Sequence, residues 1–402
     1  MRYIASIMLL SVVLMFGCKT TETKPEPLHP SETRGAEVVT RVEEKAVDVS
    51  LDSLMERGIN SAMEGSYDEA YLAFSGALEI DPKHFDAYIL RARAAFASVS
   101  DVTQVEENFS AITYNSVNQA SSVQIVKYNS SIRDLTSALE LNPEDAATYV
   151  RRGRVYAEKG DLDSALDDYN KAIELDPEMV RAYNGRGNLN ADKGSFDEAI
   201  KDFDEAIKLH PQYAEAFNNR GLVFAQRNGS GDIDKAIADY SEAIKIDPEF
   251  AIAYNNRGLA YMAKGDSDKA IADFSQVVKL DPKHSSAFIN RGKAYAAKKD
   301  LDNAIADFSE AIKANPNNAS AYNARGLVYA EKNEANNAIT DYTNAIRLNP
   351  NFAAAYNNRG AEYVIRNDNT RALADFVQAL RIEPNNEAAQ QNLNDLRRIQ
   401  GR

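Results

Sequence analysis

The chain has 402 residues and carries a formal net charge of −14 at pH 7. Because no cluster of lysine and arginine interrupts this acidity, the sequence excludes a nucleic-acid partner held through its phosphates. Its four histidines stand apart and no motif has metal-ligand or nucleophile spacing, so we expect no enzymatic activity, no cofactor and no small-molecule substrate.

The first segment, residues 1–17, predicts an export signal. Arg2 precedes an apolar run from Ile4 to Phe16, which is short for a membrane span. Cys18, the only cysteine of the chain, follows directly after Gly17. This start resembles the signal peptide of bacterial lipoproteins, and the resemblance implies cleavage before Cys18 and attachment of lipid to that residue. An ordinary cleaved signal is the alternative.

Residues 18–50 predict a disordered tether that follows the lipidated cysteine. They combine Pro25, Pro27 and Pro30 with threonine, glutamate and lysine, a composition that buries too little apolar surface to fold. Lys19 follows the cysteine, where an aspartate would indicate retention at the inner membrane of enteric bacteria. We therefore expect a lipid-anchored protein of the bacterial cell envelope, at the outer membrane and facing the periplasm.

Prolines recur at a near-fixed interval through residues 51–386, and six of the eight intervals are 34 residues long. A period of this length is typical of a solenoid, in which each unit buries its apolar face against its neighbours. Such an array displays surface rather than a catalytic cleft. The recurring prolines are Pro82, Pro143, Pro177, Pro211, Pro248, Pro282, Pro316, Pro350 and Pro384.

The unit at residues 251–284 illustrates what one period contains. Tyr254 and Gly258 share one helical face, and Ala270 and Phe274 share the face of a second helix. A Gly-Asp pair between the two stretches predicts a turn followed by a helix N-cap. Pro282 then ends the second helix, because the residue before a proline avoids helical angles. Each period is therefore predicted to be a helix–turn–helix hairpin.

The same small residues recur along the array, with glycine in eight of nine first helices and alanine in eight of nine second helices. This pattern resembles the tetratricopeptide repeat. The resemblance implies an all-α fold, a right-handed superhelical solenoid of nine helix–turn–helix units. After the last unit, Ala389, Leu393 and Leu396 form one apolar stripe, which predicts a capping helix over residues 387–402. The predicted units are 51–84, 85–145, 146–179, 180–213, 214–250, 251–284, 285–318, 319–352 and 353–386.

Two of these units are longer than the others. The unit at 214–250 has three extra residues, Gly229–Gly231, in its inter-helix turn, and the unit at 85–145 has an insert at 99–125. The longer insert lacks glycine and proline, which favours a short helix of its own. It is either a tolerated surface addition or part of a binding face.

A regular pattern of charge runs through the array. Arginine stands just before the first-helix glycine, or before Ala92 in the one unit without it, in all nine units, as at Arg257, and aspartate recurs in eight second helices, as at Asp273 before Phe274. Both positions border the packed centre of the hairpin, which favours Arg–Asp pairing within or between units. Contact with a ligand is the alternative interpretation.

Asparagine recurs at the fifth and sixth residues of the later units. The family resemblance implies that the second, fifth, ninth, twelfth and thirteenth residues of each first helix line a concave groove. Because an amide both donates and accepts hydrogen bonds, a row of asparagines can bind an extended peptide backbone without recognising its side chains. The alternative is that they only solvate the surface. The candidate peptide-binding residues are Asn184, Asn188, Asn218, Asn219, Asn255, Asn256, Asn290, Asn323, Asn357 and Asn358.

The sequence therefore predicts a membrane-anchored scaffold or adaptor that binds extended segments of other proteins in this groove. Its expected role lies in envelope assembly, secretion or protease recruitment. A surface-exposed adhesin or host-factor-binding lipoprotein is the alternative function, and it requires export across the outer membrane.

Overall fold

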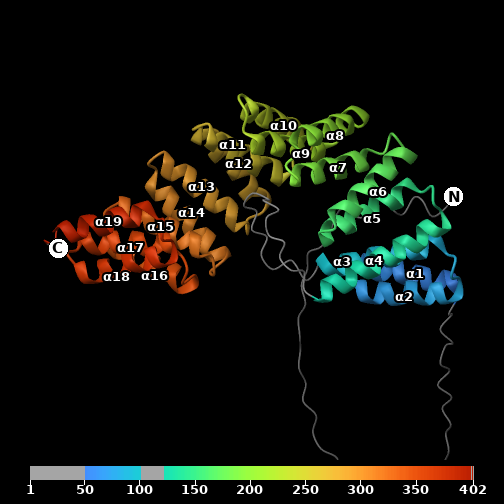
Figure 1. The fold of residues 1–402 in the computed structure, drawn as a ribbon, viewed down its shortest axis with the longest axis horizontal. Helices are drawn as coiled ribbons and strands as arrows, with labels where there is room; N and C mark the ends of the chain where they lie inside the picture. Colours follow the sequence, from blue (N-terminus) through green and yellow to red (C-terminus); the bar gives the residue numbers. More distant parts are fainter. Residues whose placement is uncertain (1–49, 101–121, 400, 402) are drawn as a thin grey trace, which may run out of the picture. The chain divides into compact units, whose positions relative to one another are not determined.

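The computed structural model describes residues 50–100, 122–399 and 401, which form nineteen α-helices and no strand (Figure 1). Consecutive helices pair from α1/α2 to α17/α18, and α19 follows alone. The pairs are helix–turn–helix hairpins except for α3 and α4, whose connection at residues 101–121 lies outside the described residues. The predicted all-α array is confirmed. The signal peptide, Cys18 and the tether lie outside the described residues. The helices are α1 (Leu51–Met63), α2 (Tyr67–Ile80), α3 (Phe85–Ser100), α4 (Ser122–Leu141), α5 (Ala146–Lys159), α6 (Leu162–Leu175), α7 (Val180–Asp192), α8 (Phe196–Leu209), α9 (Ala214–Arg227), α10 (Asp232–Ile246), α11 (Ala251–Ala263), α12 (Ser267–Leu280), α13 (Ser285–Ala297), α14 (Leu301–Ala314), α15 (Ala319–Glu331), α16 (Ala335–Leu348), α17 (Ala353–Ile365), α18 (Asn369–Ile382) and α19 (Glu387–Ile399).

The described chain divides into two compact bodies. The first contains α1 to α4 and the first turn of α5, up to Thr148. The second begins at Tyr149 in α5 and extends through α19. No described helix combines the length and the apolar composition needed to cross a membrane.

Local sequence explains why each hairpin turns and ends where it does. In the unit at 251–284, Gly265 takes a φ of +78°, a left-handed value that favours glycine. The side chain of Asp266 then caps α12 by accepting a hydrogen bond from the backbone N–H of Lys269 at 3.2 Å. At the other end, Asp281 is extended just before Pro282, so α12 stops there.

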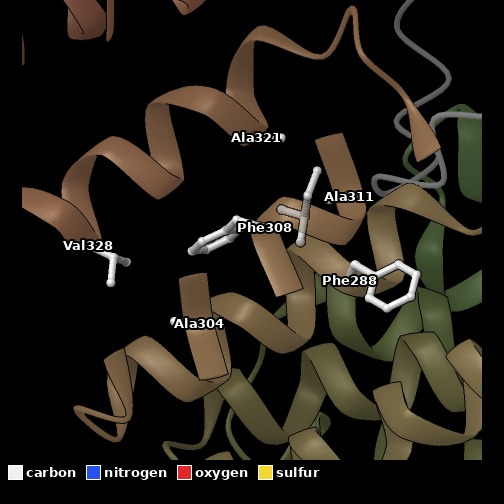
Figure 2. Close-up of a cluster of buried hydrophobic side chains, with 7 residues drawn as sticks. Phe288, Ala304, Phe308, Ala311, Ala321 and Val328 are labelled. Atoms are coloured by element: carbon white, nitrogen blue, oxygen red, sulfur yellow. The ribbon is translucent and has the colours of Figure 1, made fainter. Parts of the chain in front are cut away.

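The second-helix aromatic packs against a glycine of its own unit. A Cβ added to Gly258 would lie 2.7 Å from Cε1 of Phe274, so only glycine lets the two helices approach this closely. The other side of the aromatic is covered by the next first helix. Figure 2 illustrates this arrangement around Phe308 of α14, which shares a buried cluster with Ala321 and Val328 of α15. Within each of the two bodies, the first helix of a unit therefore completes the core of the unit before it.

First and second helices differ in how they contact their counterparts in neighbouring units. In the second body α7 contacts α9, and the contacts continue through α11, α13, α15 and α17 to α19. Among the described residues, no two consecutive second helices make a comparable contact. We call the exposed sides of α7, α9, α11, α13, α15, α17 and α19 the first-helix face. The positions predicted to line a groove lie on these helices.

The two insertions are accommodated differently. In the shorter one, the nearly buried Asp232 accepts two hydrogen bonds of 2.8 Å from Arg227 and one of 3.0 Å from the backbone N–H of Gly229. These bonds hold the longer turn in one conformation. Of the predicted insert at 99–125, residues 99–100 lie in α3 and residues 122–125 in α4, while residues 101–121 lie outside the described part of the chain.

Candidate functional site

Most of the predicted asparagines are joined in pairs across unit boundaries. In each pair, Nδ2 of the sixth residue of one first helix donates to Oδ1 of the fifth residue of the first helix before it. The five bonds run from Asn219 to Asn184 (3.2 Å), from Asn256 to Asn218 (3.0 Å), from Asn290 to Asn255 (3.1 Å), from Asn358 to Asn323 (3.1 Å) and from Asn392 to Asn357 (2.9 Å). The structure therefore brings together nine of the ten predicted residues. Asn188 is exposed and makes no such bond among the described residues.

Sequence reasoning missed one member of this set, Asn392 of α19, because it lies beyond the last proline-marked unit. A signal for it was present. Wherever the fifth residue from α7 onward is asparagine, the sixth residue of the following first helix is asparagine too. The sequence therefore predicts each pair, because an asparagine at the fifth position of one unit is accompanied by an asparagine at the sixth position of the next.

One junction between successive first helices, that between α13 and α15, has an apolar pair in place of two asparagines. Ile289 of α13 stands at the fifth position and Ala324 of α15 at the sixth, and both belong to one hydrophobic cluster. Ile289 is 8% exposed, so its side chain fills the space that an asparagine pair occupies elsewhere. An apolar pair thus satisfies the same packing requirement as an amide pair.

The inter-unit bond fixes which way each amide points. It uses one acceptor site of the fifth residue and one N–H of the sixth, which leaves the Nδ2 group of the fifth residue and the Oδ1 of the sixth for other hydrogen bonds. In α9 these two groups bind each other, because Nδ2 of Asn218 donates to Oδ1 of Asn219 at 3.2 Å. Asn218 and Asn255 are buried, at 3% and 4% exposed, and act chiefly as links between helices. The half-buried amides are the ones within reach of a ligand. They are Asn184, Asn219, Asn256, Asn290, Asn323, Asn357 and Asn358.

The rest of the first-helix face carries little charge. At the ninth position of the first helices, Leu222 and Leu259 are half-buried and Leu327 is 47% exposed. Lys293 is the cation in this row. Glu331, at the thirteenth position of α15, is paired with Lys299 at 2.6 Å. The face therefore offers oriented amides beside small apolar surfaces.

The arginines and aspartates pair within units, which decides between the two pairings that the sequence left open. The guanidinium donates two hydrogen bonds of 2.7–3.0 Å to the aspartate of the same hairpin, whose side chain is almost fully buried. The pairs are Arg91–Asp134, Arg152–Asp168, Arg186–Asp202, Arg220–Asp239, Arg257–Asp273, Arg291–Asp307, Arg325–Asp341 and Arg359–Asp375.

The same guanidinium also binds the preceding unit. Nη1 of Arg257 donates to Ser241 of α10 at 3.0 Å, and Nη1 of Arg291 donates to Ser275 of α12 at 3.1 Å. Hydrogen bonding to Asp273 raises the pKa of Arg257 above its ordinary value, so the guanidinium stays charged across the physiological range. These buried, mutually satisfied groups hold three helices together and favour the structural interpretation of the Arg–Asp pattern over ligand contact.

Within residues 50–100, 122–399 and 401, no group of three or more His, Cys, Asp and Glu side chains lies close enough together to hold a metal ion.

The fold and the junctions define a helical-repeat array, and comparison with known families identifies which one. Models of the tetratricopeptide repeat match residues 127–180, 150–214, 255–319, 289–342 and 353–386, and a further model of this repeat matches residues 230–265 and 326–363. Together they cover residues 127–214 and 230–386, which is more than half of the chain. The chain belongs to the tetratricopeptide repeat family, whose arrays serve as scaffolds that bind other proteins.

Three solved structures with similar folds are the following. YrrB, described as a TPR protein with an unusual peptide-binding site, is 28% identical, with a TM-score of 0.39 over 49% of this chain and 97% of that chain. A tetratricopeptide repeat protein from Parabacteroides merdae is 21% identical, with a TM-score of 0.48 over 62% of this chain and 98% of that chain. MamA is 30% identical, with a TM-score of 0.35 over 40% of this chain and 92% of that chain. No curated protein sequence matches the chain.

Proposed function

We propose that this protein is a membrane-anchored adaptor that binds extended segments of partner proteins on its first-helix face. The observation that carries the proposal is the row of half-buried amides whose orientation is fixed by bonds between units. An extended backbone presents unpaired N–H and C=O groups, and preoriented Asn Nδ2 and Oδ1 atoms complement both. Because the amides are held in place before binding, little side-chain entropy is lost when a segment docks.

The spacing of the face suits an extended chain. Packed helices lie about 8–10 Å apart, and an extended chain rises about 3.3 Å per residue, so one unit spans about three residues of a bound segment. Leu222, Leu259 and Leu327 would contact apolar side chains of that segment, while the asparagine pairs hold its backbone.

The proposed anchor is lipid on Cys18, with residues 19–50 as the tether to the array. Sequence supports this part of the proposal through the apolar run that ends at Gly17 and the single cysteine that follows. We propose a location at the outer membrane of a bacterial envelope, facing the periplasm, and a role in envelope assembly, secretion or protease recruitment.

Partner capture tests the binding face. The full chain is cross-linked in bacterial envelope extract beside a variant in which two amide pairs become Ile–Ala pairs, Asn218→Ile with Asn256→Ala and Asn255→Ile with Asn290→Ala. Because the natural Ile289–Ala324 junction tolerates this pair, the variant should keep its helical content and melting temperature. Partners lost by this variant alone support the proposal. Partners kept equally by both proteins place binding elsewhere on the chain and refute it.

Fractionation tests the anchor. In a bacterial host that processes lipoproteins, the wild-type chain should sediment with outer-membrane vesicles, and a Cys18→Ala variant should lose lipid labelling and membrane association. A tether variant, Pro27→Ala, serves as the control and should fractionate as the wild type. An unlabelled wild-type chain, or a Cys18→Ala variant that stays with the membrane, contradicts lipid anchoring.

A further inference from the structure

The helix α13 differs from its neighbours on the first-helix face in two positions at once. It is the fourth of the seven helices that form this face. Its fifth residue is Ile289, where the adjacent first helices have asparagine, and its ninth is Lys293, where they have Leu259 and Leu327. Residues four apart lie one helical turn apart on the same side, so both changes alter one patch of surface.

Lys293 is the one unpaired charge on the central part of the face. From α11 to α17, the second, fifth, sixth, ninth, twelfth and thirteenth residues of the first helices include two charged side chains, Lys293 and Glu331. Glu331 is already paired with Lys299. Lys293 is exposed and has no ion pair among the described residues.

The chemistry of the face is therefore different at its centre. On both sides of α13, asparagine pairs offer hydrogen bonds that any peptide backbone can use. At α13 the backbone-binding pair is replaced toward α15 by the buried Ile289–Ala324 contact, and a cation stands among apolar neighbours. The amide pairs bind the peptide backbone, which is the same in every sequence, so they cannot select one segment over another. Lys293 and the leucines beside it contact side chains of the segment, so a preference for particular residues can arise at α13.

We infer that α13 is the specificity-determining helix, and that the face selects an extended segment with one Asp or Glu whose carboxylate pairs with Lys293. This inference rests on the proposed function. A segment that covered Lys293 without supplying a carboxylate would bury an unpaired charge, which is unfavourable. Apolar residues of the segment flank the carboxylate and lie on Leu259 and Leu327.

The charge of the whole protein restricts the segment to a single acidic residue at this place. With a net charge of −14, the protein repels acidic tracts, and from α11 to α17 the face has no second cation to compensate a further carboxylate. One carboxylate among uncharged residues is therefore the pattern that fits.

Selection from a random library tests this inference. The full chain is used to select from phage-displayed peptides about twelve residues long, enough to span about four units. Two charge-reversal variants are selected in parallel, Lys293→Glu on the face and Lys279→Glu on the exposed side of α12. Lys279 likewise has no ion pair among the described residues, so the second variant matches the change in net charge.

We expect the wild type and Lys279→Glu to enrich peptides with one Asp or Glu between apolar residues, and Lys293→Glu to enrich Lys or Arg at that place. In a synthetic copy of a selected peptide, replacing the acid by its amide should weaken binding to the wild type about tenfold, as expected for the loss of one charge-assisted hydrogen bond. The same replacement should not weaken binding to Lys293→Glu.

Two results overturn the inference in distinguishable ways. If all three proteins select the same peptides without an acid, and the Ile–Ala pair variant loses them, the amide face binds peptides but α13 does not select them. If the wild type enriches no peptide at all, both the selectivity of α13 and the proposed function fail.

Discussion

The interior units and the two ends of the array differ at the arginine position of the first helix and in the residues that contact it. In the units at 85–145 and from residue 180 to residue 386, an arginine joins the aspartate of its own hairpin to a polar side chain of the preceding second helix. In the first unit, Arg57 has Ala73 in the place of the aspartate, is exposed, and makes no ion pair among the described residues. At the other end, Leu393 stands in the place of the arginine and Val377 in the place of the polar acceptor.

This comparison indicates the structural role of the arginine in the array. It is paired with an aspartate in every unit from 85–145 to 353–386, it has no ion pair among the described residues in the first unit, and leucine replaces it in α19. In α19, Leu393 instead joins Leu396 and Phe376 in a hydrophobic cluster, so apolar contact replaces the arginine at the last junction, beside the hydrogen bond from Asn392 to Asn357. The Arg–Asp pair therefore couples units, and is not required for a hairpin to form.

The largest effect is expected from breaking an interior pair. Asp273→Ala leaves the guanidinium of Arg257 without its carboxylate and should destabilise the array by about 3–5 kcal/mol. Arg57→Ala in the first unit should change stability by less than about 0.5 kcal/mol. Because a repeat array need not unfold in one step, hydrogen exchange in α11 and α12 is the appropriate measurement beside urea unfolding.

A second substitution tests whether the loss of stability comes from the unpaired charge of Arg257 or from the loss of packing. Adding Arg257→Leu to Asp273→Ala imitates the apolar junction at α19 and should recover most of the lost stability, because the unpaired charge is gone. Equal losses in the interior variant and in Arg57→Ala would contradict the difference between interior and end.

A smaller effect is expected at Glu362 of α17. This residue is 6% exposed at the tenth position of its unit, where interior units have buried apolar residues such as Val223 and Val328. Burial raises the pKa of Glu362, and Arg366 opposes this in part. The pKa of Glu362 is therefore higher in the folded state than in the unfolded state. Its protonation contributes to folding stability in full below the unfolded-state pKa, and this contribution is lost as the pH rises through the folded-state pKa.

Glu362→Val should therefore stabilise the protein by about 1 kcal/mol at pH 7, because it removes a carboxyl group whose charged form is disfavoured by burial. The gain should shrink toward about pH 4, where both states of the wild type bind the proton. Melting temperature against pH measures this, with Glu310→Val as a control at an exposed, ion-paired position. A gain of the same size at both pH values would show that packing, and not ionisation, accounts for it.

The fold could be predicted from the sequence because its determinants are local. The glycines that face aromatics, the Asp N-cap at residue 266 and the prolines after second helices each fix one step of the hairpin. The candidate face could be predicted only in part. The fifth and sixth positions were identified, but the bond from Asn256 back to Asn218 depends on how far successive first helices are offset, which a single repeat does not encode.

The Arg–Asp partners could not be assigned from sequence for a related reason. The two residues of a hairpin are 16 apart in the unit at 251–284, and the polar acceptor of the preceding unit lies 16 residues in the other direction. Sequence distance is equal for both, so only packing decides that Arg257 binds Asp273 with two bonds and Ser241 with one.

The matched junctions restrict how the order of the repeats can change during evolution. Loss of residues 251–284 would bring Asn218 against Asn290, and the new neighbours would again be two amides. Loss of residues 285–318 would bring the buried Asn255 against Ala324, which has no group to donate to its carbonyl. Duplication and loss of whole repeats are therefore tolerated at some boundaries and penalised at others, although these two repeats have the same length.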